Sequence, residues 1–200
     1  MLLFWRKGYE GASMSDLTAA LGVTKPSLYA AFGNKEQLFR KVLDRYDQRT
    51  AGFLSDSIRA ATAREVAAGL LRGAAEFHAS PANPPGCLMV QSALVGSVAS
   101  ASARRETRSR RNRLREAIQE RLERVLHGED LPCGAEPAAL ACYLVAVMRG
   151  MAVEAASGAG AAELHEIVDV ALMSWPGSKK AATARRKLKN ETDAPRPRLT

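Results

Sequence analysis

Cysteine, histidine and aromatic residues are scarce in this chain of 200 residues, which argues against several kinds of site. The cysteines are Cys87, Cys133 and Cys142, and an odd number at irregular spacing predicts neither a disulfide framework nor a zinc site. The three histidines do not share the spacing of metal ligands on a helix. We therefore expect no metal site.

Enzymatic motifs and membrane segments are also missing. The chain has no glycine-rich phosphate loop, no nucleophile elbow and no pair of catalytic carboxylates, so we expect no catalytic residue, no cofactor and no enzyme activity. The longest apolar run, residues 140–148, is too short to span a bilayer. The apolar start meets Arg6 and Lys7 before it reaches the length of a signal peptide. We expect no membrane association and a cytoplasmic protein.

The remaining composition is typical of a globular protein made of packed helices. Apolar residues make up 46% of the chain, charged residues 25% and aromatic residues only 6%, while alanine is abundant. The net charge of +8 favours an acidic partner, but residues 178–200 hold eight basic and two acidic residues. We expect residues 177–200 to be a disordered basic tail, so an argument for DNA binding needs particular residues.

Two short helices joined by a glycine turn are predicted near the N-terminus. Ser13 begins a capping box for a helix over residues 14–21, which ends at Gly22. Thr24 is a good N-cap for a second helix over residues 25–32. This arrangement is typical of a helix-turn-helix, whose second helix enters the major groove of double-stranded DNA.

Helical periodicity predicts the other elements and an all-α fold. Residues 2–8 form the end of a first helix that stops at Gly8. Later helices are predicted from residue 35 onward and over residues 62–79, 87–100, 103–127, 137–157 and 161–174. We expect an N-terminal three-helix helix-turn-helix domain (1–46), a helical ligand-binding and dimerisation bundle (47–176) and the tail (177–200).

The N-terminal residues closely resemble the DNA-binding domain of the TetR family of repressors. The matching stretches are Phe4-Trp-Arg-Lys-Gly-Tyr9, Ser13-Met-Ser-Asp-Leu17, Leu21-Gly-Val-Thr-Lys-Pro-Ser-Leu-Tyr29 and Phe32-Gly-Asn-Lys-Glu-Gln-Leu-Phe39. Residues 137–171 also resemble the antiparallel helices of that family's dimerising bundle. The resemblance implies a repressor that binds a palindromic operator as a homodimer, with an unknown small-molecule effector.

The resemblance also implies a set of DNA contacts. They are Ser13, Ser15, Thr24, Lys25, Ser27, Tyr29 and Lys35. Most lie at or near helix starts, where side chains and free N–H groups meet bases or phosphates. Ser13 and Thr24 could instead be caps only, and Tyr29 could cover the core. We expect a buried core that includes Leu17, Leu21, Leu28, Phe32 and Phe39.

An effector pocket is implied in the central helices. Its candidate lining residues are Phe77, Met89, Met148 and Met151, since methionine adapts to varied ligands. Cys87 opens a predicted helix, where a thiolate is favoured, and is a candidate redox thiol. The alternative for each of these residues is ordinary core packing, and we expect Cys142 to lie in the core.

Three further interpretations complete the predictions. Residues 104–115 contain seven arginines, which form either a second surface for an acidic partner or membrane, or a solvated helix face. Members of the family usually have a longer first helix, so we expect the true product to be longer. The alternative function is a helical ligand- or redox-sensing dimer with an impaired helix-turn-helix.

Overall fold

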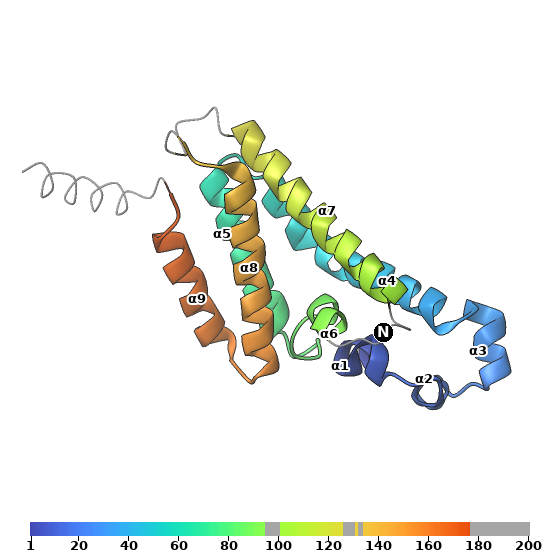
Figure 1. Ribbon diagram of the computed structural model, residues 1–200. Helices are drawn as coiled ribbons and strands as arrows, with labels where there is room; N and C mark the ends of the chain where they lie inside the picture. Colours follow the sequence, from blue (N-terminus) through green and yellow to red (C-terminus); the bar gives the residue numbers. More distant parts are fainter. Residues whose placement is uncertain (95–100, 126–130, 132–133, 177–200) are drawn as a thin grey trace, which may run out of the picture.

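The computed structural model describes residues 1–94, 101–125, 131 and 134–176, and every regular element in these ranges is a helix. The helices are α1 (Leu2–Gly11), α2 (Met14–Leu21), α3 (Lys25–Phe32), α4 (Lys35–Arg59), α5 (Ala63–Ala79), α6 (Leu88–Leu94), α7 (Ala101–Val125), α8 (Pro137–Ala156) and α9 (Ala161–Met173). Figure 1 shows α1, α2 and α3 at one end of an elongated molecule and α5, α8 and α9 at the other. The predicted all-α fold is confirmed.

The two helices of the helix-turn-helix begin and end where their caps predicted. Ser13 Oγ accepts a hydrogen bond from Asp16 N at 3.0 Å, and the Asp16 carboxylate accepts one from Ser13 N at 3.1 Å. Gly22 ends α2 with φ 66°, a left-handed conformation that suits glycine. Thr24 Oγ1 caps α3 by accepting from Ser27 N at 3.3 Å.

Helix α1 does not stop at Gly8, as the sequence analysis expected. Gly8 has φ 67° and ψ −179°, which interrupts the helical backbone, but a further turn carries α1 to Gly11. A Cβ atom at position 8 would lie 3.3 Å from the Gln91 carbonyl oxygen. Glycine at this position therefore permits both the left-handed backbone and the close approach of α1 to α6.

The core consists of two apolar clusters, one toward each end of the molecule. The first cluster surrounds Phe4, Trp5, Phe39 and Leu43, and it also includes Leu88 of α6 and Ala103 of α7. The second cluster fills the space between α5, α7, α8 and α9, with Val66, Leu70, Ile118, Leu122, Leu144, Leu164 and Val168 among its members. Because α6 and α7 contribute to the first cluster, the helix-turn-helix half packs directly on the rest of the protein.

Helix α4 crosses the predicted domain boundary at residue 46 without a break. It begins with a capping box in which Asn34 Oδ1 accepts from Gln37 N at 2.9 Å, and it continues for 25 residues. Its first turns bury Leu38, Phe39, Val42, Leu43 and Tyr46, and its later turns pack against α5 and α7. Figure 1 shows α4 and α7 running together between the two ends. The boundary itself stays a prediction.

The later helices agree with the predicted segments to within two residues, except that α6 ends at Leu94. Residues 95–100, which were predicted to continue it, lie outside the described residues. The expected disorder of residues 177–200 and the position of Cys133 also lie outside them.

Helix α8 is central to the bundle. Within the described ranges, it alone has the length and mean hydropathy, 1.5, of a membrane-spanning segment. It contacts α5, α7 and α9, and its buried side chains include Ala141, Leu144, Val145 and Met151. This packing is that of the core helix of a helical bundle.

Candidate nucleic-acid interface and effector pocket

Helix α3 presents polar side chains to solvent and anchors itself through one apolar residue. Six of the seven residues assigned to DNA binding are exposed, namely Ser13, Ser15, Thr24, Lys25, Ser27 and Tyr29. Tyr29 is 48% exposed, so it does not cover the core, whereas Leu28 beside it is 2% exposed. An anchored helix with an exposed polar side is the geometry that insertion into a groove needs.

Two of the exposed hydroxyl groups also serve as helix caps. Ser13 caps α2 and Thr24 caps α3, and Thr24 Oγ1 lies 2.9 Å from Ser27 Oγ in a further hydrogen bond. A hydroxyl has one donor and two acceptor sites, so a capping hydroxyl keeps capacity for another partner. Capping and DNA contact are therefore compatible at Ser13 and Thr24.

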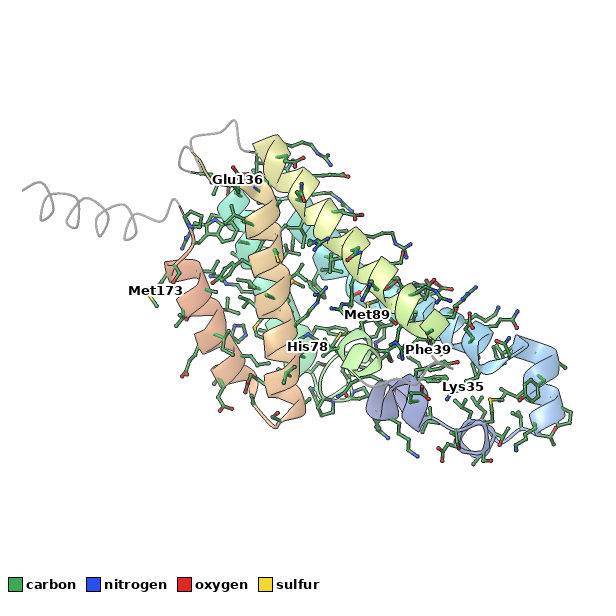
Figure 2. All side chains as sticks on the ribbon, viewed as in Figure 1. Lys35, Phe39, His78, Met89, Glu136 and Met173 are labelled. Carbon is green, nitrogen blue, oxygen red and sulfur yellow. The ribbon has the colours of Figure 1, made fainter. Side chains whose placement is uncertain are left out.

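Lys35 differs from the other six residues because it is half-buried. Its Nζ lies 4.5 Å from the centroid of the Tyr9 ring, which is the geometry of a cation–π contact. Burial lowers the pKa of Lys35. Figure 2 shows Lys35 and Phe39 near the junction of α4 with α1. Lys35 therefore helps to join α4 to α1, and its contact with DNA stays a prediction.

Leu21 is a correction to the expected core, because it is 53% exposed. It is the last residue of α2, and it lines a groove together with Leu2, Leu3 and Leu38. Leu17, Leu28 and Phe39 are buried as expected, and Phe32 is half-buried.

A cavity of about 120 Å³ lies where α4, α5, α6, α7 and α8 meet. Phe77, Met89, Met148 and Cys87 are among its lining residues. Met151 is not, because it is fully buried in the second apolar cluster. Figure 2 shows His78 and Met89 close to this junction of helices. The sequence had not indicated His78 or Tyr46, which also line the cavity.

Hydrogen bonds fix one wall of the cavity. The Tyr46 hydroxyl donates to Cys87 Sγ at 3.1 Å, and burial raises the pKa of Tyr46 so far that it stays a donor. Burial lowers the pKa of His78, so its ring is neutral at pH 7. Since the Gly86 carbonyl only accepts, the His78 Nδ1 at 3.2 Å carries the hydrogen. Trp5 Nε1 donates to the same carbonyl at 3.1 Å.

Arg110 forms an ion-pair cluster that the sequence had not predicted. Its side chain is 10% exposed and contacts Asp47 at 2.5 Å, Asp44 at 2.7 Å and Glu106 at 2.7 Å. Two of these carboxylates belong to α4, so the cluster joins α7 to α4 beside the cavity. The arginine-rich segment 104–115 is therefore partly a structural contact and not only a solvated face.

Two other arginines, Arg111 of α7 and Arg149 of α8, line the same cavity. Among the described residues, no carboxylate forms an ion pair with either guanidinium group. Arg111 Nε is buried and has no hydrogen-bond partner there.

Cys142 is exposed, contrary to the expectation that it lies in the core. It follows the buried Ala141 on α8 but lies on the outer side of that helix. No group of three or more potential metal ligands is found in the part of the chain that the structure describes.

A chain whose described elements are all helices, with a capped and exposed second helix of a helix-turn-helix close to its N-terminus, is built as a helix-turn-helix DNA-binding protein. The sequence model of the bacterial regulatory proteins of the tetR family matches residues 1–42. The transcriptional repressor ComR of Escherichia coli K12 is 35% identical over 184 residues, which cover 88% of this chain and 85% of ComR. The chain belongs to the TetR family, and it is a DNA-binding transcriptional repressor, not an enzyme.

The likeness covers the helical bundle as well as the helix-turn-helix. The TetR family regulator CifR, solved with 26-base-pair double-stranded operator DNA, has a TM-score of 0.82 and 36% identity, covering 88% of this chain and 92% of CifR. A putative TetR regulator from Rhodococcus sp. RHA1 has a TM-score of 0.62 and 40% identity, covering 88% and 94%. The predicted order of a helix-turn-helix domain and a helical domain is thus confirmed.

Proposed function

We propose that this repressor binds a near-palindromic operator as a homodimer, and that a small-molecule effector in the cavity releases it. The observation that carries the proposal is that α4 belongs to both sites. Its first turns hold the helix-turn-helix, and Tyr46, Asp47, Thr50, Phe53 and Leu54 of the same helix line the cavity. A ligand that moves α4 therefore also moves α3 relative to DNA.

Exposed apolar side chains on α8 and α9 support the homodimer. On α8 they are Tyr143, 39% exposed, and Val153, 44% exposed. On α9 they are Val170, 58% exposed, and Met173, 50% exposed, and Tyr143 and Val170 line one shallow groove. A twofold axis brings the same surface of two subunits together and repeats the recognition helix, as a palindrome requires.

The DNA contacts of the proposal are the exposed residues at the helix starts. Thr24, Lys25 and Ser27 begin α3 and Tyr29 follows one turn later, while Ser13 and Ser15 are at the start of α2. CifR, which is similar to this chain over most of its length, binds double-stranded operator DNA. Lys35 joins the set as a phosphate contact. A bacterial transcriptional repressor works where its operator DNA lies, which is the cytoplasm.

Selection from random DNA duplexes tests the proposal. The full chain is incubated with the pool, and bound duplexes are recovered and sequenced. We expect a sequence with two inverted half-sites whose centres are one or more helical turns apart. The matched control is the Lys25→Ala, Tyr29→Ala double variant, which should enrich no palindrome. Failure of the unaltered chain to enrich one would favour the alternative of a sensing dimer with an impaired helix-turn-helix.

A further inference from the structure

We infer that the cavity takes an organic anion, namely a carboxylate with an apolar body about one aromatic ring in size, held by Arg111 and Arg149. The inference rests on the proposed function, in which this cavity receives an effector. It adds the chemical class of that effector.

The size and lining of the cavity suit a small apolar body. Its volume is about 120 Å³, and its walls include the side chains of Phe53, Leu54, Phe77, Leu114 and Met148. An apolar cavity of roughly this size, about 150 Å³, is large enough to bind benzene. One ring or a short branched chain therefore fills the apolar part.

Some charged residues of the cavity wall have an ion-pair partner and others do not. Arg110 and Asp47 pair with each other at 2.5 Å, so neither needs a ligand. Arg111 and Arg149 come from different helices, and within the described ranges neither has an ion pair. Arg111 Nε is also buried, with no acceptor in the part of the chain that the structure describes. Burying a donor that lacks an acceptor is unfavourable, and a carboxylate supplies acceptors in the geometry that a guanidinium group prefers.

The two guanidinium groups also repel each other. The pKa of Arg149 is lowered first by burial and then by the positive charges of Arg111 and Arg115, while Cys87 and Cys142 oppose the change. A bound anion would relieve this repulsion and the cost of burial together. A neutral ligand would leave the repulsion in place, and a cation would increase it. The wall therefore selects for negative charge.

Matched pairs of acids and alcohols test the preference directly. The pairs are benzoate with benzyl alcohol, 3-phenylpropanoate with 3-phenylpropan-1-ol, and hexanoate with hexan-1-ol. Titration calorimetry on the full chain gives each dissociation constant, and a gel shift with the selected operator gives release. We expect at least one carboxylate to bind about tenfold or more tightly than its alcohol, since a charge-assisted hydrogen bond separates the two.

Variants of the two arginines identify the binding groups. Arg111→Gln and Arg149→Gln should each weaken carboxylate binding by about 10-fold to 100-fold and leave alcohol binding unchanged. Arg108→Gln is the matched control, because Arg108 is exposed on the same helix and does not line the cavity. Arg111→Met tests for a structural role. It removes an unpaired buried donor, so the melting temperature of the free protein should stay equal or rise while carboxylate binding disappears.

The inference is overturned if no carboxylate in the panel binds more tightly than its alcohol, or if the arginine variants weaken both members of a pair equally. A large fall in melting temperature for Arg111→Met would also overturn it, because the residue would then support the fold. Failure of the proposed function has a different signature. Carboxylate binding that depends on Arg111 and Arg149 but leaves the operator complex intact would support the anion site and contradict release by an effector.

Discussion

Trp5 and His78 donate hydrogen bonds to the same carbonyl oxygen, that of Gly86, at 3.1 Å and 3.2 Å. Trp5 belongs to α1 and His78 to α5, so this carbonyl connects the helix-turn-helix to the wall of the cavity. Gly86 has φ +85°, and a Cβ atom there would lie 3.0 Å from the Ala156 Cβ. Backbone conformation and available space therefore both require glycine at this junction.

His78 should make stability depend on pH. Burial holds the pKa of His78 in the folded protein below the ordinary 6.5. As the pH falls below 6.5, His78 is therefore protonated in the unfolded chain before it is protonated in the folded protein. The stabilisation from neutral His78 is thus complete above pH 6.5 and is lost as pH falls toward the folded pKa.

The variant His78→Asn tests this expectation, because asparagine keeps a donor near Gly86 but does not titrate. We expect urea denaturation at fixed protein concentration to show a steeper decline from pH 7.5 to 5.5 in the unaltered protein than in His78→Asn. Equal slopes would show that His78 is accessible to protons in the folded state.

Lys25 and Tyr29 should contribute to operator binding in distinguishable ways. Each substitution by alanine should cost about 1 kcal/mol per half-site, or roughly 30-fold in the affinity of a dimer. Lys25→Ala should also lower the salt dependence by about one unit for each phosphate that the lysine no longer neutralises. Tyr29→Ala should leave the salt dependence unchanged, because a hydroxyl carries no charge.

Fluorescence anisotropy at several salt concentrations measures both the affinity for the operator and its salt dependence. The control is Arg124→Ala, because Arg124 lies near the C-terminal end of α7, far along the chain from the helix-turn-helix. If Lys25→Ala and Tyr29→Ala both bind the operator with unaltered affinity, the assignment of these residues to DNA contact is wrong.

Val170→Asp should disrupt the homodimer. Val170 is 58% exposed in one chain, and the proposed dimer would bury it among apolar side chains. An unpaired carboxylate there costs several kcal/mol, so the dimer dissociation constant should rise by a factor of about 100 or more. Sedimentation velocity measures the change. The control is Asn112→Asp, which adds the same charge at an exposed position of α7 and should leave the dimer intact. A dimer that survives Val170→Asp would place the interface on another surface.

Arg110→Met should lower the free energy of unfolding. Arg110 is 10% exposed, but its partners Asp44, Asp47 and Glu106 are 60%, 43% and 26% exposed. Because water still reaches the carboxylates, the expected loss is about 1–3 kcal/mol, less than for a fully buried pair. Asp44→Asn, at the most exposed partner, should cost under about 1 kcal/mol. Denaturation of the two variants checks this order, and the reverse order would contradict the central role of Arg110.

Cys87 and Cys142 provide a direct comparison for the redox interpretation. Cys142 is exposed and Cys87 is half-buried, so exposure alone predicts that Cys142 reacts first with hypochlorite or a quinone. A redox role for Cys87 predicts the opposite order, with the Tyr46 hydroxyl, which donates to Cys87 Sγ at 3.1 Å, as the group that assists the sulfur. Tyr46→Phe should then slow Cys87 alone. Mass spectrometry of brief reactions measures the order, and faster reaction at Cys142 would show that the redox interpretation is wrong.

The sequence predicted helix boundaries correctly where they are set by residues close together in the chain. The caps at Ser13, Thr24 and Asn34 each join residues three positions apart, and all three helices begin where these residues indicated. Burial was harder to predict. Leu21 and Cys142 have apolar neighbours in sequence, but which side of a helix is covered depends on the elements packed against it, and both residues are exposed.

The cavity depends on packing between residues far apart in the chain. Arg110 and Asp47 are separated by 63 positions, and neither residue alone differs from an ordinary surface charge in the sequence. The same holds for Arg111 and Arg149, which meet only because α7 packs on α8. The methionine and phenylalanine residues of the sequence indicated an apolar pocket. The charged residues of its wall could be identified only once the packing of the helices was known.

The continuity of α4 restricts how repressors of this kind can be recombined. An α-helix turns by about 100° per residue, so one residue inserted between Tyr46 and Thr50 would rotate the DNA-reading end by roughly that angle against the bundle. Functional chimaeras between this chain and a relative must therefore preserve the number of residues across the junction, or change it by nearly whole turns. The number of residues along α4 therefore helps to set which operator spacing the protein fits, although it is a property of the backbone and not of any one side chain.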